Sequence, residues 1–459
     1  NGTQALTLVA GTGTTTIQGE IGGSSALTSL TITNGTANGA IEIANIGGVT
    51  GATAIGNTNT GTITLDGTAY STAGTQTYTA AAGQNIDITG AATFTTTNDN
   101  VSFATSGVDL ANNGTTTINT GTAGGTVSFG GAIEGNTAGA PFNDLLVITS
   151  GTGDVTFSGA IGATNALGGL SVNASSGDGN ITFSSTIGDT SNPGVVGTTS
   201  IGNTDTADLN FNAATYSFDG GTTTITAASG DTIDMGALAD TSFTTAADNI
   251  TFATGTIELL NGSNLTVDTG ATGGDITIAS IAGTSVETVT LDAGTGALSV
   301  GAIGSGTEIG AVTLGSTDDG TVTLNGAIKT DGNVTITGPV SLATGAISVT
   351  TTNDNITFTG TVNGAQTLTL VAGTATTNIT GAIGADTALT GLTITNGTAN
   401  GTITLGGNIG DGSGAGVEGT TSIGNTNTGD LNFNGTLYSF DGTTTITAAS
   451  GDTIDMGAL

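Results

Sequence analysis

Residues 367–384 read TLTLVAGTATTNITGAIG and nearly repeat residues 5–22, ALTLVAGTGTTTIQGEIG, which lie 362 positions earlier. In the first part of both stretches apolar residues alternate with threonine or alanine. Successive side chains of a β-strand point to opposite faces, so this alternation is typical of a strand with one buried face. Glycine-containing dipeptides that favour turns separate the short runs. The stretch therefore predicts short β-strands joined by tight turns.

Three families of internal copies extend this pattern over the chain. The first pair lies near residues 1–43 and 363–405. The second lies at 200–238 and returns at 422–459 one residue shorter, because Gly220-Gly221 becomes a single Gly442; a diverged relative begins at Ile55. The third contains TTTNDNVSF at 95–103, TTAADNITF at 244–252 and TTTNDNITF at 350–358.

The offsets between these copies predict a solenoid. They are 146, 149, 106, 222 and 362 residues, close to whole multiples of a unit of about 21–22 residues, as expected when one coil is repeated. A chain of β-sandwich domains would instead repeat at about 100 residues. We expect an all-β fold, a right-handed parallel β-helix of about 21–22 residues per coil and roughly 22 coils. It should run through residues 1–459 as one continuous segment of a longer repetitive protein.

The core of this solenoid should consist of aliphatic ladders. Inward positions are mostly Ile, Val, Leu and Ala, with an occasional aromatic residue such as Phe211, Tyr216 and Phe218. The recurring β-branched runs argue against disorder. Glycine, although there are 81, has no three-residue period, which excludes collagen.

The charge of the chain restricts its partners. There are 35 acidic residues and one base, Lys329, which gives a formal charge of −34. Such a chain repels phosphate backbones, so nucleic acid and anionic membranes are poor partners. No cysteine is present, which excludes disulfides and thiolate metal sites. No apolar run approaches the roughly 20 residues of a membrane span.

The repeats LTLVAGTGTTTIQGEIG and LTLVAGTATTNITGAIG resemble those of filamentous-haemagglutinin-like and autotransporter-type bacterial exoproteins. The resemblance covers essentially the whole chain, although the motif is degenerate and mostly structural. It implies a secreted or surface-displayed β-helical fibre that serves adhesion, aggregation or coating of the cell envelope.

Catalysis finds little support among the residues. His, Arg and Cys are absent, so acid–base chemistry would fall to carboxylates, Tyr or Lys329. Asp318-Asp319 lie in a turn, and the pair Asp205 and Asp208 becomes Asn427 and Asp430 in the later copy. We therefore predict that the chain is not an enzyme and has no catalytic, cofactor-binding or metal-binding residues.

One acid does recur, as Asp87, Asp234 and Asp455, each between apolar residues. Alternation predicts that these side chains point outward into solvent, and cation binding is the alternative. Calcium would need several converging oxygen ligands, and no EF-hand loop or glycine-rich nonapeptide array is present. We expect only weak, non-specific binding of divalent cations.

Outward threonines suggest a further alternative. Flat threonine ladders are used by ice-binding β-solenoids, but threonine is also a good solvent-facing strand residue. Here the Thr-x-Thr pair drifts among strands and is interrupted by Glu42, Asp87 and Asp234. Asn-x-Thr sequons, which leave glycosylation open, occur at Asn34, Asn113, Asn249, Asn333 and Asn396.

These patterns together predict a non-enzymatic, extracellular structural or adhesive fibre segment of a large bacterial surface protein. Its partners would be a cell surface, neighbouring cells or further copies of itself. The alternatives are a self-assembling filament or sheath subunit and, less favoured, a threonine-rich ice-binding solenoid. Lys329, in GAIKTDG, should lie at a turn-like position.

Overall fold

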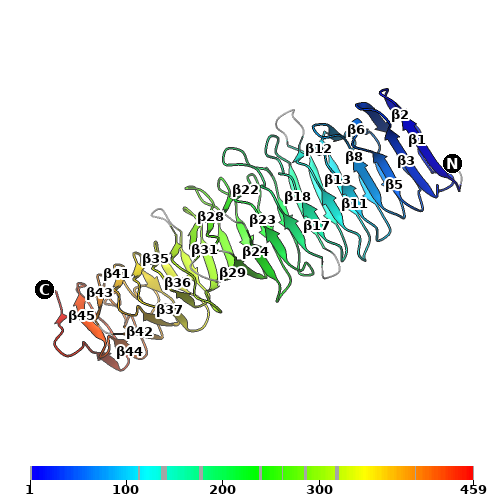
Figure 1. Cartoon of the computed structure of the whole chain (residues 1–459). Coiled ribbons are helices and arrows are strands. Elements are labelled where there is room, and N and C mark those ends of the chain that lie inside the picture. The colour runs from blue at the N-terminus through cyan, green and yellow to red at the C-terminus, as the bar shows by residue number, and fades with distance from the viewer. Residues whose placement is uncertain are drawn as a thin grey trace. The chain divides into compact units, whose positions relative to one another are not determined.

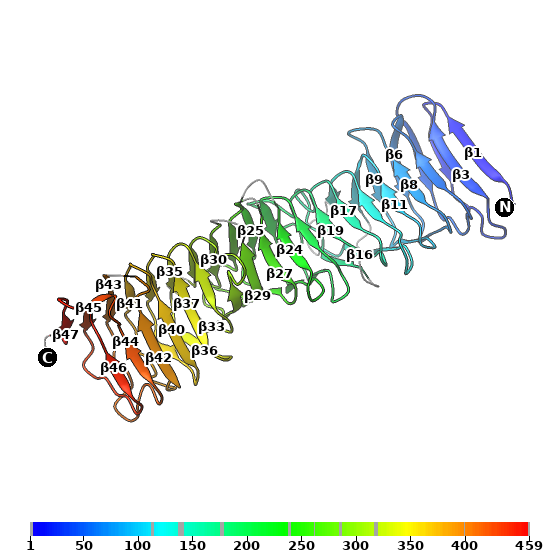
Figure 2. The same ribbon diagram turned by 60° about the horizontal axis from the view of Figure 1, so that its bottom comes forward.

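The computed structural model describes residues 3–111, 114–135, 142–174, 179–236, 240–260, 262–283, 287–315, 320–398 and 400–457. These residues form 47 strands and no helix, and parallel sheets stack as a β-solenoid of about 18 turns. The predicted all-β parallel solenoid is thereby confirmed. The chain divides into two compact units; its extension as one continuous segment stays a prediction. Figures 1 and 2 show how strands lie side by side within each unit.

Unit 1 comprises residues 1–237 and 253–255, and its strands form three parallel ladders. Ladder 1A contains β1 (Ala5–Ala10), β3 (Ser29–Asn34), β5 (Thr53–Gly56), β8 (Gln76–Thr79), β11 (Val101–Phe103), β14 (Val127–Phe129), β17 (Val155–Phe157), β19 (Ile181–Phe183), β21 (Leu209–Phe211) and β24 (Thr232–Met235). Ladder 1B contains β2 (Thr15–Ile17), β4 (Gly39–Ile43), β6 (Thr60–Leu65), β9 (Asn85–Ile88), β12 (Gly107–Leu110) and β15 (Ile133–Glu134), and continues through single bridges at Ile161 and Ile187 to β22 (Thr215–Ser217). Ladder 1C contains β7 (Ala69–Ser71), β10 (Thr93–Thr95), β13 (Thr115–Asn119), β16 (Leu145–Thr149), β18 (Gly169–Asn173), β20 (Thr199–Ile201) and β23 (Thr223–Ile225).

Unit 2 comprises residues 238–252 and 256–459 and has the same three-ladder construction. Ladder 2A contains β27 (Thr256–Leu259), β29 (Ile276–Gly283), β31 (Leu298–Ile303), β34 (Ile328–Thr330), β37 (Ile347–Thr351), β40 (Thr367–Val371), β42 (Gly391–Thr395), β44 (Thr421–Ile423) and β46 (Thr444–Ile446). Ladder 2B contains β25 (Thr241–Thr244), β28 (Leu265–Asp268), β30 (Val289–Asp292), β32 (Val312–Leu314), β35 (Val334–Ile336), β38 (Ile356–Phe358), β41 (Thr377–Ile379), β43 (Gly401–Leu405), β45 (Thr428–Phe433) and β47 (Ile454–Asp455). Ladder 2C contains β26 (Ile250–Phe252), the first halves of β29 and β31, β33 (Val322–Leu324), β36 (Val340–Leu342) and β39 (Val362–Asn363).

The predicted alternation of side chains is seen directly in the strands. In β3 the side chains of Leu30 and Ile32 are fully buried, whereas Thr31 and Thr33 on the other face are partly exposed. Each strand pairs with the strand of the next coil rather than with its neighbour in sequence, so Leu30 stacks directly on Leu6 and Ile32 on Leu8. A narrow core of stacked apolar side chains results.

The length of a coil varies more than the sequence suggested. In unit 1, Leu30 pairs with Thr53 but Val127 pairs with Val155, so the second of these coils is clearly longer than the first. The expected coil length is met in unit 2, where four positions follow one another in register: Val312, Val334, Ile356 and Thr377. Turns of different length cause this variation, because the paired strands keep their register. The prediction of roughly 22 coils was wrong, since the solenoid has about 18 turns.

An aromatic stack replaces the expected aliphatic ladder in part of unit 1. Six rings on successive strands of ladder 1A stack with centroid separations of 4.9–5.4 Å and interplanar angles of 16° or less: Tyr78, Phe103, Phe129, Phe157, Phe183 and Phe211. All six side chains are buried. Offset stacking at such distances adds to the burial of large apolar area, so this stack is a major stabilising feature of unit 1.

Internal copies adopt the same local geometry. In the first pair, Leu6 pairs with Leu30 and Leu368 with Leu392, and the two separations along the chain are equal. In the second pair, Thr199 pairs with Thr223, whereas Thr421 pairs with Thr444 across a coil that is one position shorter. The single residue lost where Gly220-Gly221 becomes Gly442 thus shortens one corner and leaves the pairing of the strands unchanged.

A buried asparagine forms one corner of the first pair of copies. Asn34 donates from Nδ2 to the Gly11 carbonyl at 3.0 Å, and the corresponding Asn396 donates to the Ala375 carbonyl at 3.0 Å. Both side chains are fully buried. A Cβ on Gly39 would overlap the Asn34 amide, so this corner requires glycine at that position.

Candidate interaction surfaces

The recurring acids point outward, as predicted, but two of them are not fully solvated. Asp87 and Asp234 are partly buried between neighbours that are at most 1% exposed, such as Ile86 and Ile233. Burial, followed by the charge of a nearby carboxylate, raises the pKa of both acids. The expectation of simply solvated carboxylates was wrong for these two.

The third recurring acid, Asp455, is exposed, and so are its apolar neighbours. Ile454 and Met456 are 46% and 49% exposed, whereas the corresponding Ile233 and Met235 are 0% exposed. The prediction that alternation buries the flanking residues therefore holds for two of the three copies. Ile454 and Met456 lie in the last coil that the structure describes.

Carboxylates are stacked on the outer face of ladder 1B. In β4, β6, β9, β12 and β15 the outward residues at one register position are Glu42, Thr64, Asp87, Asp109 and Glu134. The last three pair directly in successive coils, which lie about 4.8 Å apart. We call the four acids the acidic column. Turns of unequal length separate its members, so the linear sequence did not reveal it.

Several other acids accept hydrogen bonds that join successive coils. Asp154 Oδ1 accepts from the backbone N–H of Asn180 at 2.9 Å, and Asn180 Oδ1 accepts from the N–H of Asp208 at 3.1 Å. Asp208 Oδ1 in turn accepts from the N–H of Thr232 at 3.0 Å. These side chains form a relay along unit 1, so part of the acidic content stabilises the corners of the coils.

Of the carboxylates Asp205 and Asp208, the second holds a corner of the coil. Asp208 accepts from Thr232, and its counterpart Asp430 accepts in the same way from Thr453 N–H at 2.9 Å. Asp205 is exposed in a turn. Asp318 and Asp319 lie outside the described residues.

A column of hydroxyl side chains runs along ladder 2B. At one outward position, six successive strands from β25 to β38 carry, in direct register, Ser242, Thr266, Thr290, Thr313, Thr335 and Thr357. Within the described part of the chain none of these hydroxyls has a protein hydrogen-bond partner. We call this set the threonine column. The spacing of these residues along the sequence varies because the turns differ in length, whereas their position within each strand stays the same.

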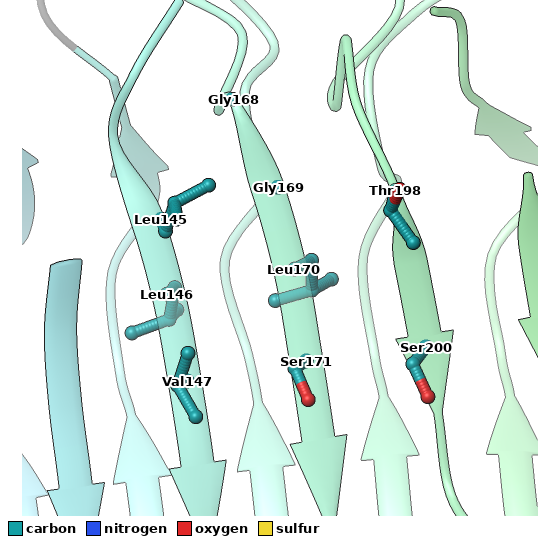
Figure 3. Close-up of a pocket in the computed structure, with 9 residues that line it drawn as sticks. All are labelled: Leu145, Leu146, Val147, Gly168, Gly169, Leu170, Ser171, Thr198 and Ser200. Carbon is teal, nitrogen blue, oxygen red and sulfur yellow. The ribbon is translucent and has the colours of Figure 1, made fainter. Parts of the chain in front are cut away.

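An open apolar groove of about 420 Å³ crosses β16, β18 and the start of β20 in unit 1. Figure 3 shows Leu145 and Val147 on one strand, with Gly169 and Ser171 on the next. Leu145 pairs with Gly169 and is 38% exposed. Because Gly169 has no side chain, the outer surface is hollowed beside Leu145.

Lys329 lies within a strand rather than at the predicted turn. It is the central residue of β34, with Ile328 and Thr330 buried on either side. Its Nζ lies 3.0 Å from Glu308 Oε1, and Thr352 donates to the other carboxylate oxygen at 3.0 Å. These two donors hold the pKa of Glu308 below its usual value.

The sequons differ in accessibility. Asn34 and Asn396 are fully buried with their amides engaged in the core, so neither suits glycan attachment in the folded chain. Asn249 and Asn333 accept from the backbone N–H groups of Asp275 and Asn355 in the next coil. Asn113 lies outside the described residues.

The described residues offer neither a metal-binding cluster nor a membrane-spanning helix, and comparison with known proteins gave no match. In the described ranges no three His, Cys, Asp or Glu side chains gather closely enough to hold a metal ion. The same ranges contain no helix long and apolar enough to span a membrane. The chain showed no match to a protein family, to a curated protein or to a solved structure.

Proposed function

We propose that the chain is a non-enzymatic structural and adhesive fibre segment of a large, repetitive bacterial surface protein, displayed outside the cell. The supporting observation is the equivalence of the internal copies. Blocks that lie far apart along the chain keep the same strand pairing, as in Leu6 with Leu30 and Leu368 with Leu392. A fold that can take in additional coils without rearrangement suits a fibre whose function depends on its length.

The hydrogen bonds between successive coils suit a protein that is exposed outside the cell. Strand amides bond to neighbouring coils, and side chains such as Asp154 and Asn180 add bonds between coils. A cut in one turn therefore leaves both pieces held by the coils above and below. The resemblance to haemagglutinin-like exoproteins, carried by the repeats at 5–22 and 367–384, supports the same location and role.

Deleting the gene from the producing cells tests this proposal. We expect attachment to surfaces or to other cells to fall, and antibodies against the chain to label intact cells. Normal attachment by the deletion strain, or labelling only after permeabilisation, would contradict the adhesive extracellular role.

A self-assembling filament or sheath is the alternative form of this function. Electron microscopy of the purified chain separates the two. Single thin particles support a segment of a longer fibre, whereas homogeneous ordered polymers support self-assembly.

A second candidate function, ice binding, is favoured by the threonine column alone. Its five threonines occupy one fixed position in successive coils, and the separation of about 4.8 Å between strands is close to an oxygen repeat of hexagonal ice. Thermal hysteresis that is lost in Thr313→Lys and kept in Glu258→Lys, at an outward position of β27 that pairs with Ala282, would support it. Absence of hysteresis in the unaltered chain would exclude it.

A further inference from the structure

The acidic column of unit 1 has no positive neighbour. The sequence contains no Arg or His and only one Lys, which is bonded to Glu308 in unit 2. The titratable side chains that β4, β6, β9, β12 and β15 place on the outer face of ladder 1B are all acids, namely Glu42, Asp87, Asp109 and Glu134, and the residue that follows β6 is a further acid, Asp66. Repulsion within the column is therefore relieved only by protons or by ions from solvent.

Hydrogen bonds hold the carboxylates of β12 and β15 in place. Asn85 donates from Nδ2 to Asp109 Oδ2 at 2.7 Å. Glu134 Oε2 accepts from the backbone N–H groups of Thr164 and Asn165 at 3.0 and 2.7 Å. These bonds limit the freedom of the carboxylates to swing apart, so their repulsion acts on the stacking of the coils.

We propose that the acidic column makes the coils of β9, β12 and β15 a pH-responsive segment of unit 1. These coils pack more tightly as the pH falls, and they open locally as it rises.

The direction follows from proton binding. Burial first, and then the charge of Asp109, raises the pKa of Asp87. Burial also raises the pKa of Glu134, with the charge of Asp109 adding to it, against the opposing effect of its backbone hydrogen bonds. Unfolded Asp and Glu titrate at about 3.9 and 4.3, so the folded segment binds more protons above these values. Its stability is therefore present at low pH and is lost as the pH rises through the raised values.

Hydrogen exchange followed by mass spectrometry on the whole chain tests the proposal at constant ionic strength. Between about pH 8 and about pH 4, which is close to the unfolded values, protection of β9, β12 and β15, corrected for intrinsic exchange, should rise more than protection of β19. Asp109→Asn should raise protection of these three strands at about pH 8 by about three- to tenfold, because it removes the charge that adds to the raised pKa of Asp87 and Glu134, and should flatten the pH dependence of that protection.

Two further variants complete the test. Asp205→Asn removes the same charge from unit 1 at a position that is already Asn427 in the other copy, and it should leave these strands unchanged. Thr64→Asp extends the column and should lower protection at about pH 8, with recovery at about pH 4. If Asp109→Asn and Asp205→Asn behave alike, or if the three strands show no pH dependence beyond that of β19, the proposal is overturned.

Discussion

Lys329 Nζ lies 3.0 Å from Glu308 Oε1, and this is the pairing of the chain's single basic side chain. The two side chains are 50% and 33% exposed. An exposed pair of this kind contributes about 0–1 kcal/mol. Lys329 is the only residue in the sequence after which trypsin can cleave, and it lies within strand β34.

Trypsin should therefore leave the folded chain intact. The protease needs an extended, locally detached segment, whereas both neighbours of Lys329 are buried in the stack. We expect one band on a denaturing gel after digestion of folded material, and two fragments after digestion of unfolded material. As a control, Ser305→Lys adds a site in an exposed turn and should be cut in the folded state. Rapid cleavage at Lys329 in the folded state would contradict the placement of β34.

Replacing a ring in the aromatic stack should destabilise unit 1 strongly. Phe157 lies between Phe129 and Phe183, with centroid separations of 5.4 and 4.9 Å. Phe157→Ala should cost about 3–5 kcal/mol through lost burial and the cavity that it leaves. Phe142→Ala, at a side chain that is 37% exposed, is the control and should cost much less. Denaturant unfolding followed by local exchange at β14, β17 and β19 measures the difference, and equal effects would argue against the stack.

A methyl group at Gly39 should disrupt the asparagine corner. Gly39→Ala places its Cβ against the Asn34 amide and close to two backbone carbonyls, so we expect a loss of more than about 1 kcal/mol. Gly13→Ala has no atom within 4 Å of the added Cβ and should be neutral or slightly stabilising. Thermal unfolding of the two variants checks the contrast. If both behave alike, the packing described for this corner is incorrect.

Salt should promote association of the chains. With a formal charge of −34, separate copies repel each other, and the Debye length falls from about 30 Å at 0.01 M to about 8 Å at 0.15 M salt. Light scattering should therefore rise with sodium chloride and more steeply with magnesium. If scattering is highest in low salt, repulsion between the negative charges does not control the association of the chains.

The fold class followed from local pattern, because alternation such as Leu30-Thr31-Ile32 is a property of the strand itself. The equivalence of the copies could also be predicted, since similar segments pair in the same way. Coil length could not be predicted, because turns absorb insertions without changing the register of the strands that they join.

Features that run along the solenoid were hidden for the same reason. The step along the chain from Phe129 to Phe157 is longer than the step from Phe157 to Phe183, so no constant period identifies the stack. In the acidic column, likewise, the step from Asp87 to Asp109 is shorter than the step from Asp109 to Glu134.

Lys329 was misplaced for a different reason. Lys329 stands two residues before the Asp331-Gly332 dipeptide, which favours a turn, and β34 extends to Thr330. A turn dipeptide marks where a strand has ended, but it does not say how close to the turn the strand continues.

The copy at 422–459 has one glycine fewer than the copy at 200–238. This difference bears on how a gene with such repeats can gain or lose sequence. Near-identical blocks invite unequal recombination, which adds or removes whole stretches of coding sequence. In most folds an imprecise junction would leave a chain unable to pack. Here a recombination junction that falls in a corner changes only the length of a turn. The corner with the single Gly442 is an example, because Thr421 and Thr444 on either side of it still pair. A repetitive gene of this kind can therefore absorb small differences at its junctions in the turns, while the strands keep their pairing.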